Sequence, residues 1–212
     1  DYDAHAGPRI VRMPAYAGDA CITAPLPPDA QGHFARAMAR ADLDTLLLTE
    51  ARRAGAEVFQ PCHVTSVSGC QLSGFITRTQ DGRELRSRTV ALAHGLAQRG
   101  ALSGEAKPPA PPAAARYVCF KTHLRGGTIP ADTIAIAGAR GAYAGLVRSS
   151  GCARAALAFV VRRDRLAAVG PSAEAQLSAI LTETPHFADL IAGAERDGPW
   201  LASGPLAPGI RE

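Results

Sequence analysis

Apolar and polar positions along the chain first predict one amphipathic helix near residue 40. From Leu43 to Ala54 the apolar residues recur every three or four positions, a spacing that predicts one buried helical face. Acidic residues fall in the first turn and two arginines in the last, which suits the helix dipole. Gly55 follows as a left-handed cap.

The stretch after this helix predicts β-structure. Asp81-Gly82 is a strong hairpin signal, because glycine accepts the positive φ of the turn. The nearly continuous apolar run at 89–93 predicts a buried strand. Together these residues predict a meander laid over a parallel sheet, with strands at 57–60, 63–67, 71–79, 83–88 and 89–93.

Prolines divide the chain. Residues 10–13 predict a short strand that Pro14 ends, and the prolines of 24–28 predict an irregular loop, because proline lacks a backbone donor. The proline-dense stretch 100–116 predicts a linker. We therefore expect one domain over residues 1–99 and a second over 117–212, returning toward the first at 200–212.

The sequence pattern of residues 117–212 predicts an antiparallel sheet with helices on one side. Its apolar runs are separated by glycines, so neighbouring strands should pair through short turns. Ser172 is placed to cap a helix that ends near Leu181. The expected elements are strands at 117–124, 133–137, 142–147, 155–161 and 200–205 and helices at 172–181 and 187–193, which makes the fold class mixed α/β (α+β).

Composition, net charge and cysteine spacing exclude several classes of protein. Hydrophobic residues make up 47% of the 212 residues and charged residues 20%, which indicates a packed core. The net charge of +4 is small and the cations are scattered, so no nucleic-acid partner is expected. No apolar run is long enough for a membrane span. The five cysteines form no C-x-x-C pair, which favours free thiols and a cytoplasmic location.

Arg40 departs from the charge pattern of the first helix. An exposed cation at a helix N-terminus is unfavourable by roughly 0.3–1 kcal/mol, so Arg40 is either solvated or meets an anion. The arginine, Leu43-Asp44, the leucine-rich helix and the sequence Ala-Gly-Ala-Glu-Val at 54–58 resemble a stretch of FAD-dependent oxidoreductases of the p-hydroxybenzoate hydroxylase and geranylgeranyl reductase superfamily. The resemblance implies that Arg40 lies against the flavin and that residues 1–99 are part of an FAD-binding domain.

Ala93-His94-Gly95 follows the expected strand 89–93. The carboxyl edge of such a strand is where open α/β sheets bind ligands. The family usually has Ala-Asp-Gly here, and some members resemble this chain in having histidine. The resemblance implies that His94 and Gly95 contact the cofactor; the alternative is a loop histidine without a ligand.

Three later motifs resemble the second domain of the same superfamily. They are Phe120-Lys121-x-His123, the run from Gly141 to Leu146, and Trp200-Leu201 with Gly204-Pro205, Gly209 and Arg211. Lys121 and His123 share one face of a strand because side chains alternate. The resemblance implies that Lys121, His123, Tyr143 and Gly145 line the substrate side; the alternative is that they are ordinary solvent-facing residues.

Together these resemblances imply an FAD-dependent oxidoreductase, of the reductase or monooxygenase type, that acts on an apolar small molecule. NAD(P)H or another carrier would supply electrons, and no catalytic acid or base is assigned. The family's G-x-G-x-x-G turn and its closing Gly-Asp segment are absent from the sequence, so the resemblance implies an internal segment. The alternative is a non-catalytic β-rich ligand-binding module. Neither a zinc site at Cys119 and His123 nor a G-x-S-x-G hydrolase site is expected.

Overall fold

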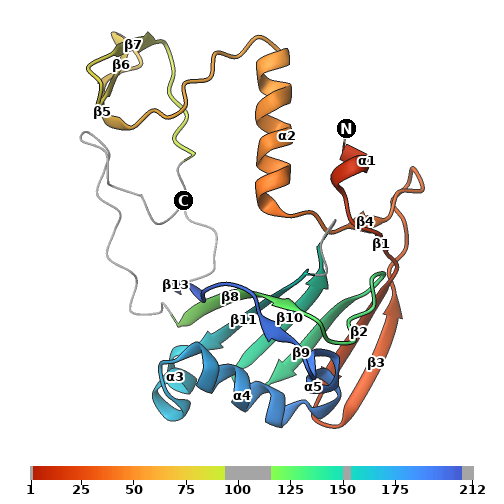
Figure 1. The fold of residues 1–212 in the computed structure, drawn as a ribbon. Coiled ribbons are helices and arrows are strands. Elements are labelled where there is room, and N and C mark those ends of the chain that lie inside the picture. Colours follow the sequence, from red (N-terminus) through yellow and green to blue (C-terminus); the bar gives the residue numbers. More distant parts are fainter. Residues whose placement is uncertain (1, 94–115, 150–153, 207–212) are drawn as a thin grey trace. The chain divides into compact units, whose positions relative to one another are not determined.

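The computed structural model describes residues 2–93, 116–149 and 154–206 (Figure 1). It divides into two compact units, residues 1–50 with 111–212, and residues 51–110. This grouping places the first 50 residues with the C-terminal sheet, an association that the sequence pattern did not indicate. The cofactor role predicted for residues 1–99 stays a prediction, and most of the expected linker lies outside the described residues.

The larger unit is built on an eight-stranded mixed sheet (Figure 1). Its strand order is β12-β8-β11-β10-β9-β2-β3, with β13 also paired to β8. All pairs are antiparallel except β2 with β9, which is parallel. The strands are β2 (Arg12–Ala17), β3 (Ala20–Pro25), β8 (Tyr117–Arg125), β9 (Ile134–Ala139), β10 (Ala142–Arg148), β11 (Arg154–Arg162), β12 (Glu195–Arg196) and β13 (Leu201–Leu206).

Three helices cover one face of this sheet: α3 (Arg163–Val169), α4 (Ala173–Glu183) and α5 (Pro185–Ile191) (Figure 1). Alternate residues of β8 to β11 point into this layer and are buried, and Ile180 and Phe187 of the helices are fully buried with them. The ring centroids of Phe120 and Phe159 lie 5.2 Å apart. This two-layer packing forms the core of the larger unit.

The C-terminal elements confirm most of the sequence prediction. The antiparallel strands, the return strand β13 and both expected helices are present. Ser172 caps α4 as predicted, since its Oγ accepts a hydrogen bond from the Ala175 N–H at 3.1 Å. Helix α3 was not predicted, because seven residues are too few to show a helical period.

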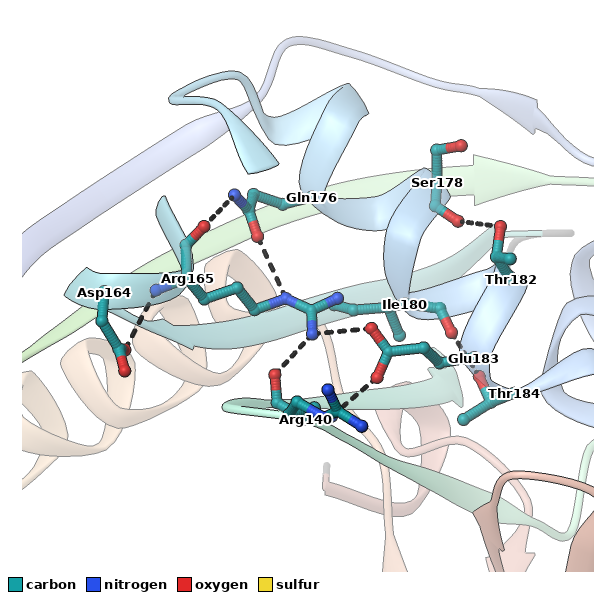
Figure 2. A network of polar contacts seen from close by, with 9 residues as sticks. All are labelled: Arg140, Asp164, Arg165, Gln176, Ser178, Ile180, Thr182, Glu183 and Thr184. Carbon is teal, nitrogen blue, oxygen red and sulfur yellow. Dashed lines mark hydrogen bonds and ion pairs between the residues drawn. The ribbon is translucent and has the colours of Figure 1, made fainter. Parts of the chain in front are cut away.

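The polar network of Figure 2 joins α3, α4 and the turn between β9 and β10. Arg165, whose side chain is 6% exposed, donates to Gln176 Oε1 at 3.3 Å and to Glu183 Oε1 at 2.8 Å. Glu183 also accepts from the Arg140 N–H at 2.8 Å. Burial raises the pKa of Glu183, but these hydrogen bonds outweigh it, and the pKa lies below its usual value. The buried guanidinium is thus neutralised by one carboxylate.

The N-terminal segments are short. Helix α1 (Tyr2–His5) precedes β1 (Arg9–Ile10), which pairs with β4 (Ala35–Arg36) in a separate two-stranded sheet. Pro14 lies inside β2 instead of ending a strand, so that expectation is wrong, as is the loop at 24–28, whose first residues belong to β3. The proline is tolerated because the parallel ladder between β2 and β9 runs from Ala15 to Ala17, beyond it.

The predicted N-terminal helix is confirmed as α2 (Arg40–Arg53), and Gly55 has the positive φ, 94°, of its cap. The expected buried face is wrong: no residue of α2 is buried, and Leu47 is 60% exposed. Periodicity shows which residues share a helix face, but burial needs a packing partner. Among the described residues no element covers this face closely enough to bury a leucine.

The smaller unit contains the predicted meander, β5 (Val64–Cys70), β6 (Gly74–Thr79) and β7 (Glu84–Ser87), and its Asp81-Gly82 turn. The strands expected at 57–60 and 89–93 are wrong, since both stretches are irregular and Leu92 is 49% exposed. A strand needs a neighbour to accept and donate its backbone hydrogen bonds. Within the described ranges no strand lies beside either stretch.

Removing the Glu183 carboxylate would leave the buried Arg165 guanidinium without its counter-charge. We expect Glu183→Ala to lower the free energy of unfolding by about 3 kcal/mol. On the same helix Glu174 pairs with Arg196 at an exposed position, and Glu174→Ala, the matched control, should cost at most about 1 kcal/mol. Urea unfolding followed by circular dichroism measures both losses. Equal losses would contradict the importance of the buried pair.

Candidate substrate-facing surface of the large sheet

The face of the sheet opposite α3–α5 carries the candidate site; we call it the open face. Because side chains alternate along each strand, every second residue of β8 to β11 points to this face. Most of its side chains are apolar and partly exposed. The open face consists of Cys119, Lys121, His123 and Arg125 of β8, Ile134, Ile136 and Gly138 of β9, Tyr143, Gly145 and Val147 of β10, and Arg154, Ala156, Ala158 and Val160 of β11.

Strand register brings the four predicted substrate-side residues onto this one face. Lys121 pairs with Ala158, which pairs with Gly145, so these three lie in one row across neighbouring strands. His123 lies two residues further along β8 on the same face, and Tyr143 two residues before Gly145. The common face agrees with the prediction, while their contact with a substrate stays a prediction.

Lys121 and His123 are polar groups at one end of this mostly apolar face, next to the paired Arg125 and Arg154. No described residue accepts a hydrogen bond from the Lys121 ammonium or contacts a His123 ring nitrogen as a hydrogen-bond partner. Burial lowers the pKa of His123 below 6.5, and the positive charges of Lys121 and Arg154 lower it further, while Asp197 opposes them. His123 is therefore neutral at pH 7, beside a cation.

A charge cluster at the end of β8 was missed by sequence reasoning. Asp197 accepts a hydrogen bond from Arg125 Nε at 2.8 Å and another from Arg154, and together they lower the pKa of Asp197 to about 2. The Asp197 N–H also donates to the His123 carbonyl at 2.8 Å. The arginines lie 72 and 43 residues from Asp197, so no local motif could reveal this support of the His123 backbone.

The predicted cofactor contacts are only partly described. Arg40 begins α2 and forms an ion pair with Asp44, Nε to Oδ1 2.6 Å, with its side chain 78% exposed. The anion it meets in the described chain is thus its own helix neighbour. His94 and Gly95 lie outside the described residues. The cofactor roles of all three stay predictions.

The described residues contain no group of three or more His, Cys, Asp or Glu side chains that could hold a metal ion. The described cysteines, Cys21, Cys62, Cys70 and Cys119, are free thiols. None of the described helices has the length and apolarity to cross a membrane.

Comparison with known proteins identifies the fold. No protein-family model and no curated protein matches the chain. The flavin-dependent brominase Bmp2 superimposes with a TM-score of 0.75 at 16% identity over 96% of this chain. The chain has the fold of part of a flavin-dependent halogenase. Halogenase CndH from a myxobacterium, described as FAD-dependent, gives a TM-score of 0.71 at 21% identity over 93% of this chain.

A flavoprotein/dehydrogenase from Cytophaga hutchinsonii shares the halogenase-like fold, with a TM-score of 0.71 at 17% identity over 92% of this chain. The chain spans about half the length of these proteins, 52%, 48% and 49% for Bmp2, CndH and the dehydrogenase. At these identities the likeness is one of fold. It confirms the expected mixed fold class, and the narrower assignment to the hydroxylase and geranylgeranyl reductase superfamily stays a prediction.

The low pKa of His123 can be tested directly. Because its folded-state pKa lies below 6.5, the unfolded chain takes up the proton first, and His123 costs stability as pH falls through this range. We expect Lys121→Met to raise the pKa of His123 part of the way to 6.5, since burial, the larger cause, remains. Lys121→Arg, the control, should leave it low. NMR titration of the imidazole measures the pKa of His123. An unchanged pKa in Lys121→Met would contradict this coupling.

Proposed function

We propose that this chain supplies the substrate-facing sheet of an FAD-dependent oxidoreductase acting on an apolar organic molecule. The observation that carries the proposal is the open face, where small apolar side chains lie beside the ammonium of Lys121 and the neutral imidazole of His123. Sites for small molecules combine such apolar surface with a few polar groups that set orientation. The halogenase-like fold supports the same assignment.

The residues of this chain suit the substrate side of such an enzyme better than the pyrophosphate side. The sequence has no G-x-G-x-x-G turn, the element that brings backbone N–H groups to a dinucleotide. Arg40 offers an exposed cation, and His94 and Gly95 remain candidate contacts. When bound, FAD would supply the redox chemistry, and the chain's own role is to bind and orient the substrate.

The open face would divide this work among its residues. Lys121 would attract an anionic or hydroxyl oxygen, and the neutral His123 can donate or accept one hydrogen bond at the same end. Tyr143 and the aliphatic residues would exclude water from the bound molecule. The proposal covers the oxidoreductase class; reductase, monooxygenase or halogenase chemistry and NAD(P)H as the electron donor are finer alternatives within it.

A second candidate function is a ligand-binding module without a cofactor. The mostly apolar, partly exposed side chains of the open face would suit such a module as well. In that case the same open face would bind an apolar ligand and no flavin would be present. The two candidate functions differ in whether a flavin is bound, but both place the ligand on the open face.

Flavin content therefore separates the two functions. We expect the protein expressed from the complete gene that contains this sequence to purify with absorbance near about 450 nm and to release FAD on denaturation, because flavin carries the proposed chemistry. Chromatography of the released cofactor distinguishes FAD from FMN. A colourless protein that also leaves the fluorescence of added FAD unchanged would contradict the oxidoreductase and leave the binding module.

A further inference from the structure

No feature of the backbone explains why residue 145 is a glycine. It lies in the middle of β10, a central strand paired on both sides, with β9 and β11. Glycine weakens such a strand because it costs conformational entropy and packs no side chain. Its φ is not in the left-handed region, and a Cβ added to it would meet no atom within 4 Å. Larger residues are therefore sterically allowed.

Other glycines of this sheet are explained by the backbone. Gly141 has a φ of 71° in the turn between β9 and β10. Gly204 has a φ of 146°, and a Cβ there would lie 3.0 Å from the Tyr117 carbonyl of β8. Gly145 shows neither a positive φ nor a close approach, so the open space above it is the feature that a side chain would remove.

The space above Gly145 is bounded by the open face. Next to it in the row lies Ala158, which is exposed and carries one methyl group. The row continues through Lys121 to Leu201 of β13 on one side and reaches Ile136 on the other. Tyr143, 56% exposed, lies two residues away along β10. Gly145 and Ala158 thus form a part of the face without large side chains, bounded along the row by Ile136 and Lys121.

We propose that Gly145 determines specificity: its missing side chain, with Ala158, leaves room for a flat apolar ring whose anionic group is bound by Lys121. This inference rests on the proposed role of the open face as the substrate-facing surface. Adjacent strands lie about 4.8 Å apart, so Gly145 and Ala158 span about the width of one ring and Lys121 begins one strand further. Without a described carboxylate partner, the Lys121 ammonium is available to an anion.

The occupant follows from charge and shape. A long flexible chain would not need a floor free of side chains, whereas a rigid ring gains contact by lying flat on the sheet. The Lys121 ammonium favours a carboxylate or phenolate over a cation, and a charge-assisted hydrogen bond is stronger than a neutral one. His123, neutral beside it, adds a donor or acceptor without a competing charge.

The experiment titrates the full 212-residue chain with 2-naphthoate, a flat apolar ring system with one carboxylate, and follows backbone amides by NMR. We expect the largest shifts at Gly145, Ala158 and Lys121. Gly145→Val should weaken binding about tenfold or more, while its thermal midpoint stays at or above that of the wild type, because valine favours strands. Loss of binding with gain of stability is the signature of a glycine kept for a ligand.

Gly138→Val is the matched control. Gly138 lies on the same face with an ordinary φ, and an added Cβ would reach only normal contact, 3.8 Å from the Tyr16 carbonyl. This variant should keep 2-naphthoate affinity within about threefold. Equal binding by wild type and Gly145→Val, or an unfolded Gly145→Val chain, would overturn the inference.

A second arm tests the anion. Lys121→Met should weaken 2-naphthoate binding about tenfold but leave binding of the uncharged 2-naphthalenemethanol unchanged, and Lys121→Arg should retain both. Shifts centred on the helix layer would overturn the assignment to the open face. Flavin in the purified protein without naphthoate binding refutes this inference alone; naphthoate binding at Gly145 without flavin refutes the proposed oxidoreductase alone.

Discussion

Burial of one face of the large sheet against α4 and α5 is the constraint on which the rest of the structure depends. Phe120, Leu157 and Phe159 alternate with the residues of the open face, so packing the first set inward turns the second set outward. A one-residue slip in β8 would bury Lys121 and His123 and expose the aromatic core. The same hydrophobic pattern therefore builds the core and presents the candidate site.

Two polar clusters hold the ends of this arrangement. Arg165 and Glu183 join the helix layer to the turn that starts β10, the strand of Tyr143 and Gly145. Asp197, held by two arginines, donates its N–H to the carbonyl of His123. The first cluster lies on the helix side, whereas Arg125 and Arg154 of the second lie by register at the end of the open face. Each cluster fixes a strand that carries this face. Most other side chains of the open face are apolar.

Sequence reasoning succeeded where local patterns carry the information. Alternation and glycine turns predicted β8 to β11, and Ser172 predicted the start of α4. It failed where a neighbour decides the outcome. Residues 89–93 look like a buried strand but have no described partner, and no described element buries the leucines of α2. For the candidate site, the alternation of side chains along a strand predicted that Lys121 and His123 lie on the same face. Only register could show that Gly145 lies in the Lys121 row, and the Asp197 cluster joins residues too distant in sequence to form a motif.

The central claim is that the open face, rather than the helix layer, meets the substrate. A crystal structure of the flavin-loaded protein with a bound aromatic carboxylate tests it most directly. The account predicts the ligand ring against Gly145 and Ala158, with its carboxylate at Lys121 and the flavin ring on the same side of the sheet. A ligand bound instead in the groove of about 430 Å³ lined by Leu177, Ile191 and Trp200, on the helix side, would contradict it.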